Sequence, residues 1–106
     1  MDQKDFPIFC TLFSEVHAKA FGEPLTKLPH GKAQTLSWLL FEATGELLSY
    51  KSLANYASAV LEGKSGKINP TGITLSILAQ YVAGQSGVSV HGIDWFRYRS
   101  SVLSQA

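Results

Sequence analysis

Cysteine and charge are both scarce in this sequence, and each scarcity excludes a class of protein. The only cysteine, Cys10, cannot form a disulfide within the chain, which excludes a disulfide-stapled scaffold and favours a reducing compartment. Charged residues make up 16% of the chain, and the net charge is +1. A strongly basic nucleic-acid binder is therefore excluded, and any contact with phosphates has to come from a local patch.

Long apolar runs are missing as well. No stretch reaches the roughly 20 apolar residues that a membrane-spanning helix needs. The N-terminal residues mix acidic side chains with a short, interrupted apolar run, which does not fit a secretory signal peptide. We therefore expect no membrane contact and a cytoplasmic protein.

The rest of the composition is that of an ordinary globular domain. The chain has 106 residues, of which 45% are hydrophobic and 11% aromatic. A chain of this length and composition can bury one core. We expect a single helical domain over residues 1–106, either alone or as one domain of a larger protein.

Apolar residues recur at spacings of three and four, which is the period of a helix facing a core. The pattern predicts helices over about 5–21, 32–44, 50–62, 71–82 and 93–103, with Asp5 and Ser49 as N-caps. Glycines follow several of them, as expected at helix ends. The only stretch that could be extended, 87–90, is interpreted as a connector. The fold class is therefore all-α: a compact bundle of about five helices.

Two of these helices carry apolar faces of special interest. In helix 50–62, the core face is expected to include Leu53, Ala57, Val60 and Leu61. Helix 32–44 is apolar nearly all round, because Trp38 and Phe41 lie outside its main stripe of Leu36, Leu39, Leu40 and Ala43. Such a helix is either central in the bundle or part of an interface.

The centre of the chain has a helix, a short turn, a capped helix that ends at a glycine, and a further helix after an Asn-Pro pair. Over residues 33–84 this order resembles the lambda-repressor-like (Cro/C1-type) helix-turn-helix family. The residues that carry the resemblance are Leu39, Gly45, Ser49, Leu53, Gly63, Asn69, Pro70, Thr74, Leu75 and Ala79.

The resemblance implies a regulatory module, expected to be a dimer, that binds double-stranded DNA with helix 50–62 as the recognition helix in a major groove. Near its start, the side chains that would face base edges are Tyr50, Lys51, Ser52 and Asn55. Backbone phosphates would be contacted by Lys64 and Lys67, with Lys27 and Lys32 before the second helix. From 27 to 67, five lysines face three glutamates, a local excess of two positive charges.

A second interpretation stays open beside this one. Lys51, Asn55, Ser58 and Glu62 recur every three or four residues and also fit a plain solvated stripe. The chain would then be a helical protein–protein interaction module, an adaptor or recruitment domain that binds a partner or a second copy of itself. Its expected interface combines large apolar and arginine side chains, a composition typical of binding hot spots: Trp38, Phe41, Trp95, Arg97 and Arg99. In the other interpretation of the last helix, Trp95 and Phe96 close the core while the two arginines stay solvated.

No catalytic or metal-binding pattern is found. His17, His30 and His91 are far apart and have no acidic or cysteine neighbour at ligand spacing, whereas a zinc site needs about four ligands in close pairs. Cys10 has no general base close enough in sequence to activate it. We expect no enzymatic activity, no cofactor and no metal.

Overall fold

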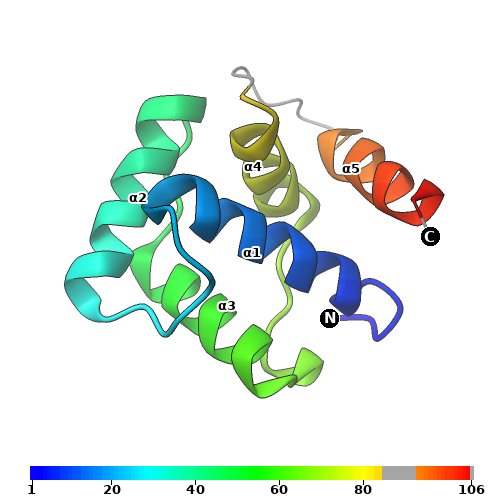
Figure 1. Cartoon of the computed structure of the whole chain (residues 1–106), viewed down its shortest axis with the longest axis horizontal. Helices are drawn as coiled ribbons and strands as arrows, with labels where there is room; N and C mark the ends of the chain where they lie inside the picture. Colours follow the sequence, from blue (N-terminus) through cyan, green and yellow to red (C-terminus); the bar gives the residue numbers. More distant parts are fainter. Residues whose placement is uncertain (85–92, 106) are drawn as a thin grey trace.

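The computed structural model describes residues 1–84 and 93–105, and these residues form an all-helical fold (Figure 1). The elements are α1 (Phe6–Phe21), α2 (His30–Thr44), α3 (Tyr50–Glu62), the short 3₁₀ turn η1 (Ser65–Lys67), α4 (Gly72–Ala83) and α5 (Ile93–Ser104). The all-helical fold class is therefore confirmed, while the connector expected at 87–90 lies outside the described residues. Within the described part of the chain, no helix combines the length and apolarity needed to cross a bilayer.

Most helix ends agree with the sequence pattern to within one residue, and α2 differs the most. It begins at His30 and not near Lys32. Pro29 has an extended backbone, and its carbonyl accepts a hydrogen bond from the Ala33 amide at 2.8 Å. The helix therefore begins at His30, two residues before the predicted range of 32–44. At α1, Asp5 stands at the N-cap position but makes no capping bond with its side chain.

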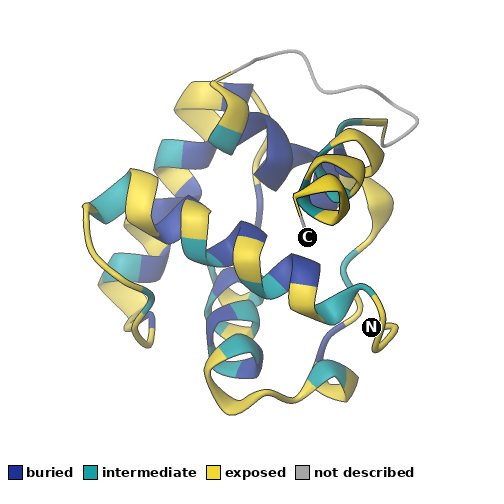
Figure 2. Ribbon diagram, turned by 45° about the vertical axis from the view of Figure 1, so that its right-hand side comes forward, coloured by how far each residue is buried: buried dark blue, intermediate teal, exposed yellow. Residues whose placement is uncertain are grey.

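The core forms where α1 packs against α2, α3 and α4. Phe9, Phe13 and Val16 of α1 have no solvent exposure. Phe9 and Phe13 stack at 5.8 Å between ring centroids, and Tyr56 of α3 meets both rings edge-on at 5.5 and 6.0 Å. Figure 2 shows the resulting division, with buried residues on the sides of the helices that face one another. This aromatic cluster fixes α3 relative to α1.

The central helix is α4 and not α2. Residues 75–81 of α4 are all buried, because α1, α2 and α5 pack against it. By contrast, Trp38 and Phe41 of α2 are 57% and 40% exposed. Ala43, expected in the main apolar stripe of α2, is also exposed, and Thr44 is buried in its place. The apolar surface around α2 thus belongs partly to the outside of the molecule.

The last helix, α5, is attached to α4 through Trp95. This side chain is 3% exposed, so it belongs to the core and not to an exposed partner surface, which corrects one of its two expected roles. Its backbone amide donates to the buried Ser76 hydroxyl at 3.1 Å, and this bond satisfies a free amide at the start of α5. Arg99 forms an ion pair with Asp5 at 2.7 Å, which ties α5 to the start of α1. Arg97 is exposed.

Candidate nucleic-acid interface

The turn between α2 and α3 is short and held by hydrogen bonds. Gly45 ends α2 with a φ of 80°, a left-handed conformation that favours glycine, and its amide donates to the Phe41 carbonyl at 2.8 Å. The Thr44 hydroxyl donates to the Leu40 carbonyl at 2.7 Å and accepts from the Glu46 amide at 3.2 Å. The chain therefore leaves α2 in one defined direction.

A buried bond then ties the far end of the turn back to α2. The Ser37 hydroxyl donates to the Leu48 carbonyl at 2.5 Å, and both residues are buried. One residue later, Ser49 caps α3 as expected, because its hydroxyl accepts from the Lys51 amide at 3.2 Å. The first turn of α3 is thus held by the bond between Ser37 and Leu48 just before it and by the Ser49 cap.

The two faces of α3 differ sharply. Leu53 and Ala57 are fully buried, while Lys51 and Asn55, one helical turn apart, are exposed. Leu61 is 45% exposed, so its expected place in the core is wrong. Eight residues of helix turn through about 80° beyond two full rotations, which moves Leu61 off the face that Leu53 defines.

Tyr50 and Ser52 are half-buried, whereas Lys51 and Asn55 are exposed. The Tyr50 ring meets the His30 ring edge-on with 4.8 Å between centroids, so the tyrosine joins the start of α3 to the start of α2. The sequence pattern missed His30 as part of this site, and the signal that could have found it is Pro29, since proline commonly stands just at the start of a helix.

A shallow pocket of about 400 Å³ lies where the starts of α2 and α3 meet. Small apolar side chains contribute to its lining, and Lys51, Asn55 and His30 add polar groups. Its lining residues are Leu28, His30, Ala33, Tyr50, Lys51, Ala54 and Asn55. Three residues expected to face DNA bases, Tyr50, Lys51 and Asn55, are therefore brought together at one place.

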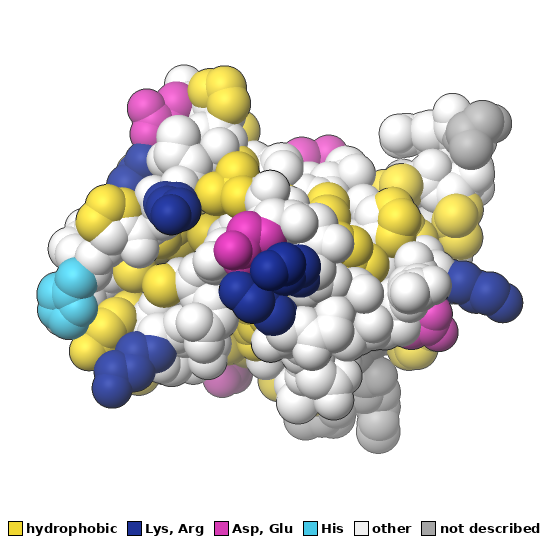
Figure 3. Space-filling model, turned by 90° about the horizontal axis from the view of Figure 1, so that it is seen from below, with side chains coloured by type: hydrophobic (Ala, Val, Ile, Leu, Met, Phe, Trp, Pro, Cys, Tyr) yellow, Lys and Arg dark blue, Asp and Glu magenta, His cyan; other side chains and the backbone are white. Residues whose placement is uncertain are grey.

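The other two lysines expected at this site lie beyond the opposite end of α3. A helix of 13 residues is roughly 20 Å long, which separates Lys64 and Lys67 from Lys51. Lys67 forms an ion pair with Glu62 at 2.8 Å, and this hydrogen-bonded ammonium group lowers the pKa of the Glu62 carboxyl. Lys64 is exposed. Figure 3, seen from the side of α3, shows basic side chains spread over this face with acidic side chains among them.

The two lysines before α2 also differ from each other. Lys32 forms an ion pair with Glu23, and its ammonium group lies 4.6 Å from the centre of the Phe21 ring. It is therefore engaged within the protein. Lys27 is exposed and forms no ion pair within the described residues. Of the lysines expected to contact DNA, Lys27, Lys51 and Lys64 are thus those without an ion pair among the described residues, and Lys64 lies beyond the far end of α3.

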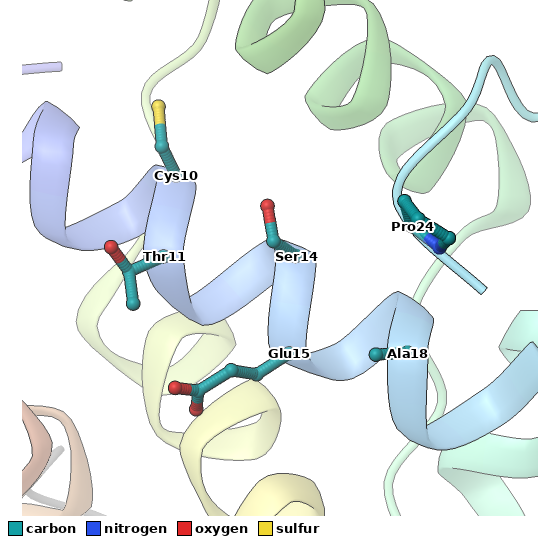
Figure 4. A pocket seen from close by; sticks show the side chains of 6 residues that line it. All are labelled: Cys10, Thr11, Ser14, Glu15, Ala18 and Pro24. Carbon is teal, nitrogen blue, oxygen red and sulfur yellow. The ribbon is translucent and has the colours of Figure 1, made fainter. Parts of the chain in front are cut away.

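A separate hollow on α1 contains Cys10 and is lined also by Thr11, Ser14, Glu15, Ala18 and Pro24 (Figure 4). In Figure 4, Cys10 and Ser14 point to one side of α1, and Thr11 and Glu15 to another. Partial burial raises the pKa of the Cys10 thiol, which is the wrong direction for a nucleophile at neutral pH.

The histidine nearest in sequence to Cys10 is engaged elsewhere. His17 is fully buried, and its Nδ1 donates to the Glu23 carbonyl at 3.1 Å. It packs against the ring of Phe21 at 4.9 Å between centroids. Among the described residues, no group of three acidic, histidine or cysteine side chains is placed to hold a metal ion. The absence of enzymatic activity stays a prediction.

No protein-family model, curated protein or solved structure matches this chain. The resemblance to the lambda-repressor-like family is therefore supported by no relative.

Proposed function

We propose that this protein is a helix-turn-helix DNA-binding module that inserts the start of α3 into a major groove. One observation carries the proposal: Lys51 and Asn55 are exposed one turn apart on α3, opposite the buried Leu53 and Ala57. Lysine can donate to guanine, and asparagine can pair with adenine through two hydrogen bonds. In a helix-turn-helix protein, the first turns of the second helix are the part that reaches base edges.

The rigidity of the turn supports the same function. Reading bases requires the side chains to be held in place before the DNA arrives, because ordering them on binding costs free energy. The bond from Ser37 to Leu48 and the Ser49 cap fix the start of α3 in the free protein. The contact between Tyr50 and His30 adds a third support.

The available charge sets the size of the expected electrostatic effect. Lys27 and Lys64 can each neutralise one phosphate, while Lys51 is assigned to a base. Each neutralised phosphate contributes about −0.9 to the slope of log K against log salt, so two give a slope of roughly −2. This is a modest salt dependence, and most of the discrimination between sequences then falls to Lys51 and Asn55.

The test is fluorescence anisotropy of a labelled duplex, first with mixed sequence at several salt concentrations and then with a site selected for tight binding. The double variant Lys51→Glu with Asn55→Ala is expected to bind the selected site at least tenfold more weakly, since one bidentate base contact contributes about 1–3 kcal/mol. Its circular dichroism should be unchanged, because both side chains are exposed.

A matched control makes the same chemical changes elsewhere. Gln3 and Lys4 are exposed in the segment before α1, and Met1 of that segment donates to the Ser65 and Ile68 carbonyls beyond the end of α3. Gln3→Ala with Lys4→Glu therefore removes one amide and reverses one charge away from Lys51 and Asn55 near the start of α3. This control is expected to lose affinity only about twofold, through net charge. Equal losses for the two double variants would rule out α3 as the recognition helix, and no binding at low salt would rule out the DNA-binding function.

The second candidate function is docking to another protein. It is favoured by the exposure of Trp38 and Phe41, whose rings lie 5.8 Å apart on the outside of α2. Exposed aromatic pairs are more typical of binding surfaces than of a solvated helix. If the duplex fails to bind at low salt, this surface becomes the leading candidate.

A further inference from the structure

The pocket at the starts of α2 and α3 has a floor that hydrogen bonds from Lys51 and Asn55 to bases do not use. Leu28 and Ala33 in its lining are buried, and Ala54 of α3 is half-buried. The side chains of these three residues have no hydrogen-bond donor or acceptor. Lys51 and Asn55 also line the pocket but are exposed, so they stand at its rim. The pocket is therefore apolar inside and polar where it opens.

The first turns of α3 place this opening directly beside the residues assigned to bases. Tyr50 and Ala54 are one helical turn apart and half-buried, and both line the pocket. Lys51 and Asn55 are the residues that follow them, one turn apart and exposed. The two pairs form neighbouring rows along the same stretch of helix. A base edge in contact with Asn55 therefore lies next to the opening beside Ala54.

The chemistry of the major groove identifies the group that fits an apolar floor. The four base pairs display hydrogen-bond donors and acceptors in this groove, and the one apolar group among them is the C5 methyl of thymine. A polar base atom placed on the floor would lose its water without gaining a partner. A methyl group gains free energy when it leaves water. Resting on the DNA-binding function proposed above, we propose that the pocket receives the C5 methyl group of a thymine next to the base that Asn55 contacts.

The dimensions of the pocket set the size of the effect. Its volume of about 400 Å³ is much larger than a methyl group, so the methyl is enclosed only in part. Complete burial of one such group strengthens binding about fourfold. The methyl group should therefore strengthen binding by about two- to fourfold. Ala54 is the residue that keeps the pocket open from the side of α3, because a larger side chain there would extend into the space.

The test uses the duplex selected for tight binding, with each thymidine replaced in turn by deoxyuridine. Deoxyuridine pairs with adenine in the same way and lacks only the C5 methyl group. By fluorescence anisotropy, the affinity of the wild-type protein should fall by about two- to fourfold at the thymine that enters the pocket. Replacements of the other thymines should leave the affinity unchanged.

A variant that fills the pocket separates a direct contact from an effect on duplex shape. Ala54→Leu occupies the space for the methyl group, so this protein should bind the thymine and uracil duplexes equally well. Ala18→Leu is the matched control, since it adds the same side chain at an exposed position of α1 outside this pocket. The control should keep the preference for thymine. Circular dichroism checks that both variants fold, and the smaller Ala54→Val takes the place of Ala54→Leu if the latter does not.

The proposed function and the methyl pocket fail in different ways. The pocket assignment is overturned if the selected site contains no thymine, or if no single replacement weakens binding. It is also overturned if the preference for thymine persists in Ala54→Leu, because the methyl group then acts through the shape of the duplex. In each of these cases the duplex still binds and the proposed function stands. If no duplex binds at low salt, the proposed function fails and the pocket assignment fails with it.

Discussion

Replacing Ser37 by alanine tests whether its buried hydrogen bond to Leu48 holds the turn between α2 and α3. In Ser37→Ala, the Leu48 carbonyl loses its hydrogen-bond donor while it stays buried between α2 and α3. A buried polar group left without a partner costs about 1–3 kcal/mol. In a domain of this size, 1 kcal/mol corresponds to a shift in Tm of about 4 °C or more.

Alanine also favours a helix more than serine does, which partly offsets this loss. Ser58→Ala is the matched control, because Ser58 is likewise inside a helix but its hydroxyl donates to Glu62 on the exposed side of α3. The gain in helix propensity is common to both variants and cancels in their difference. We therefore expect Ser37→Ala to be less stable than Ser58→Ala by about 1–3 kcal/mol.

The measurement is urea unfolding followed by circular dichroism, with the free energy of unfolding extrapolated to water. If the two variants differ by less than about 0.5 kcal/mol, the Ser37 bond does not hold the turn, since that value is within the scatter of surface substitutions. The start of α3 would then not be held in place by this bond before DNA binds.

Three further outcomes are expected. Leu53→Asp places a charge in the core, so its thermal melt should lose cooperativity, and a melt at the wild-type temperature would contradict the burial of Leu53. Gly45→Ala should lower the free energy of unfolding by about 1–2 kcal/mol because φ is +80° there, while Gly31→Ala, with open space around it and a helical backbone, should not. Lys67 lowers the pKa of Glu62, so this pair stabilises the fold above the ordinary carboxyl pKa of about 4.5 and the contribution is lost as the pH falls through the lowered value. In Glu62→Gln the stability should fall less between neutral pH and pH 3 than in the wild type, as measured by thermal melts, and an identical pH dependence would contradict the pairing.

Most of the secondary structure could be predicted from the sequence because its signals are local. The spacing of apolar residues gives the helices, and Gly22, Gly45 and Gly63 mark ends where the backbone turns left-handed. Ser49 acts as the predicted cap because capping depends on residues only two positions apart. The candidate site at the start of α3 follows in the same way, since Lys51 and Asn55 need only the helical period to share a face.

The tertiary structure decided which apolar surfaces are covered, because burial depends on what packs from elsewhere in the chain. The sequence alone does not distinguish Trp38 from Trp95. Trp95 is buried where α5 packs against α4, while Trp38 is 57% exposed. Ion pairs with residues elsewhere in the chain likewise hold Arg99, which pairs with Asp5, and Lys32, which pairs with Glu23. The local pattern thus determined the helices and the exposed pair on α3. Contacts between distant residues determined which helix is central, which cations are available and which apolar side chains of α2 and α5 stay exposed.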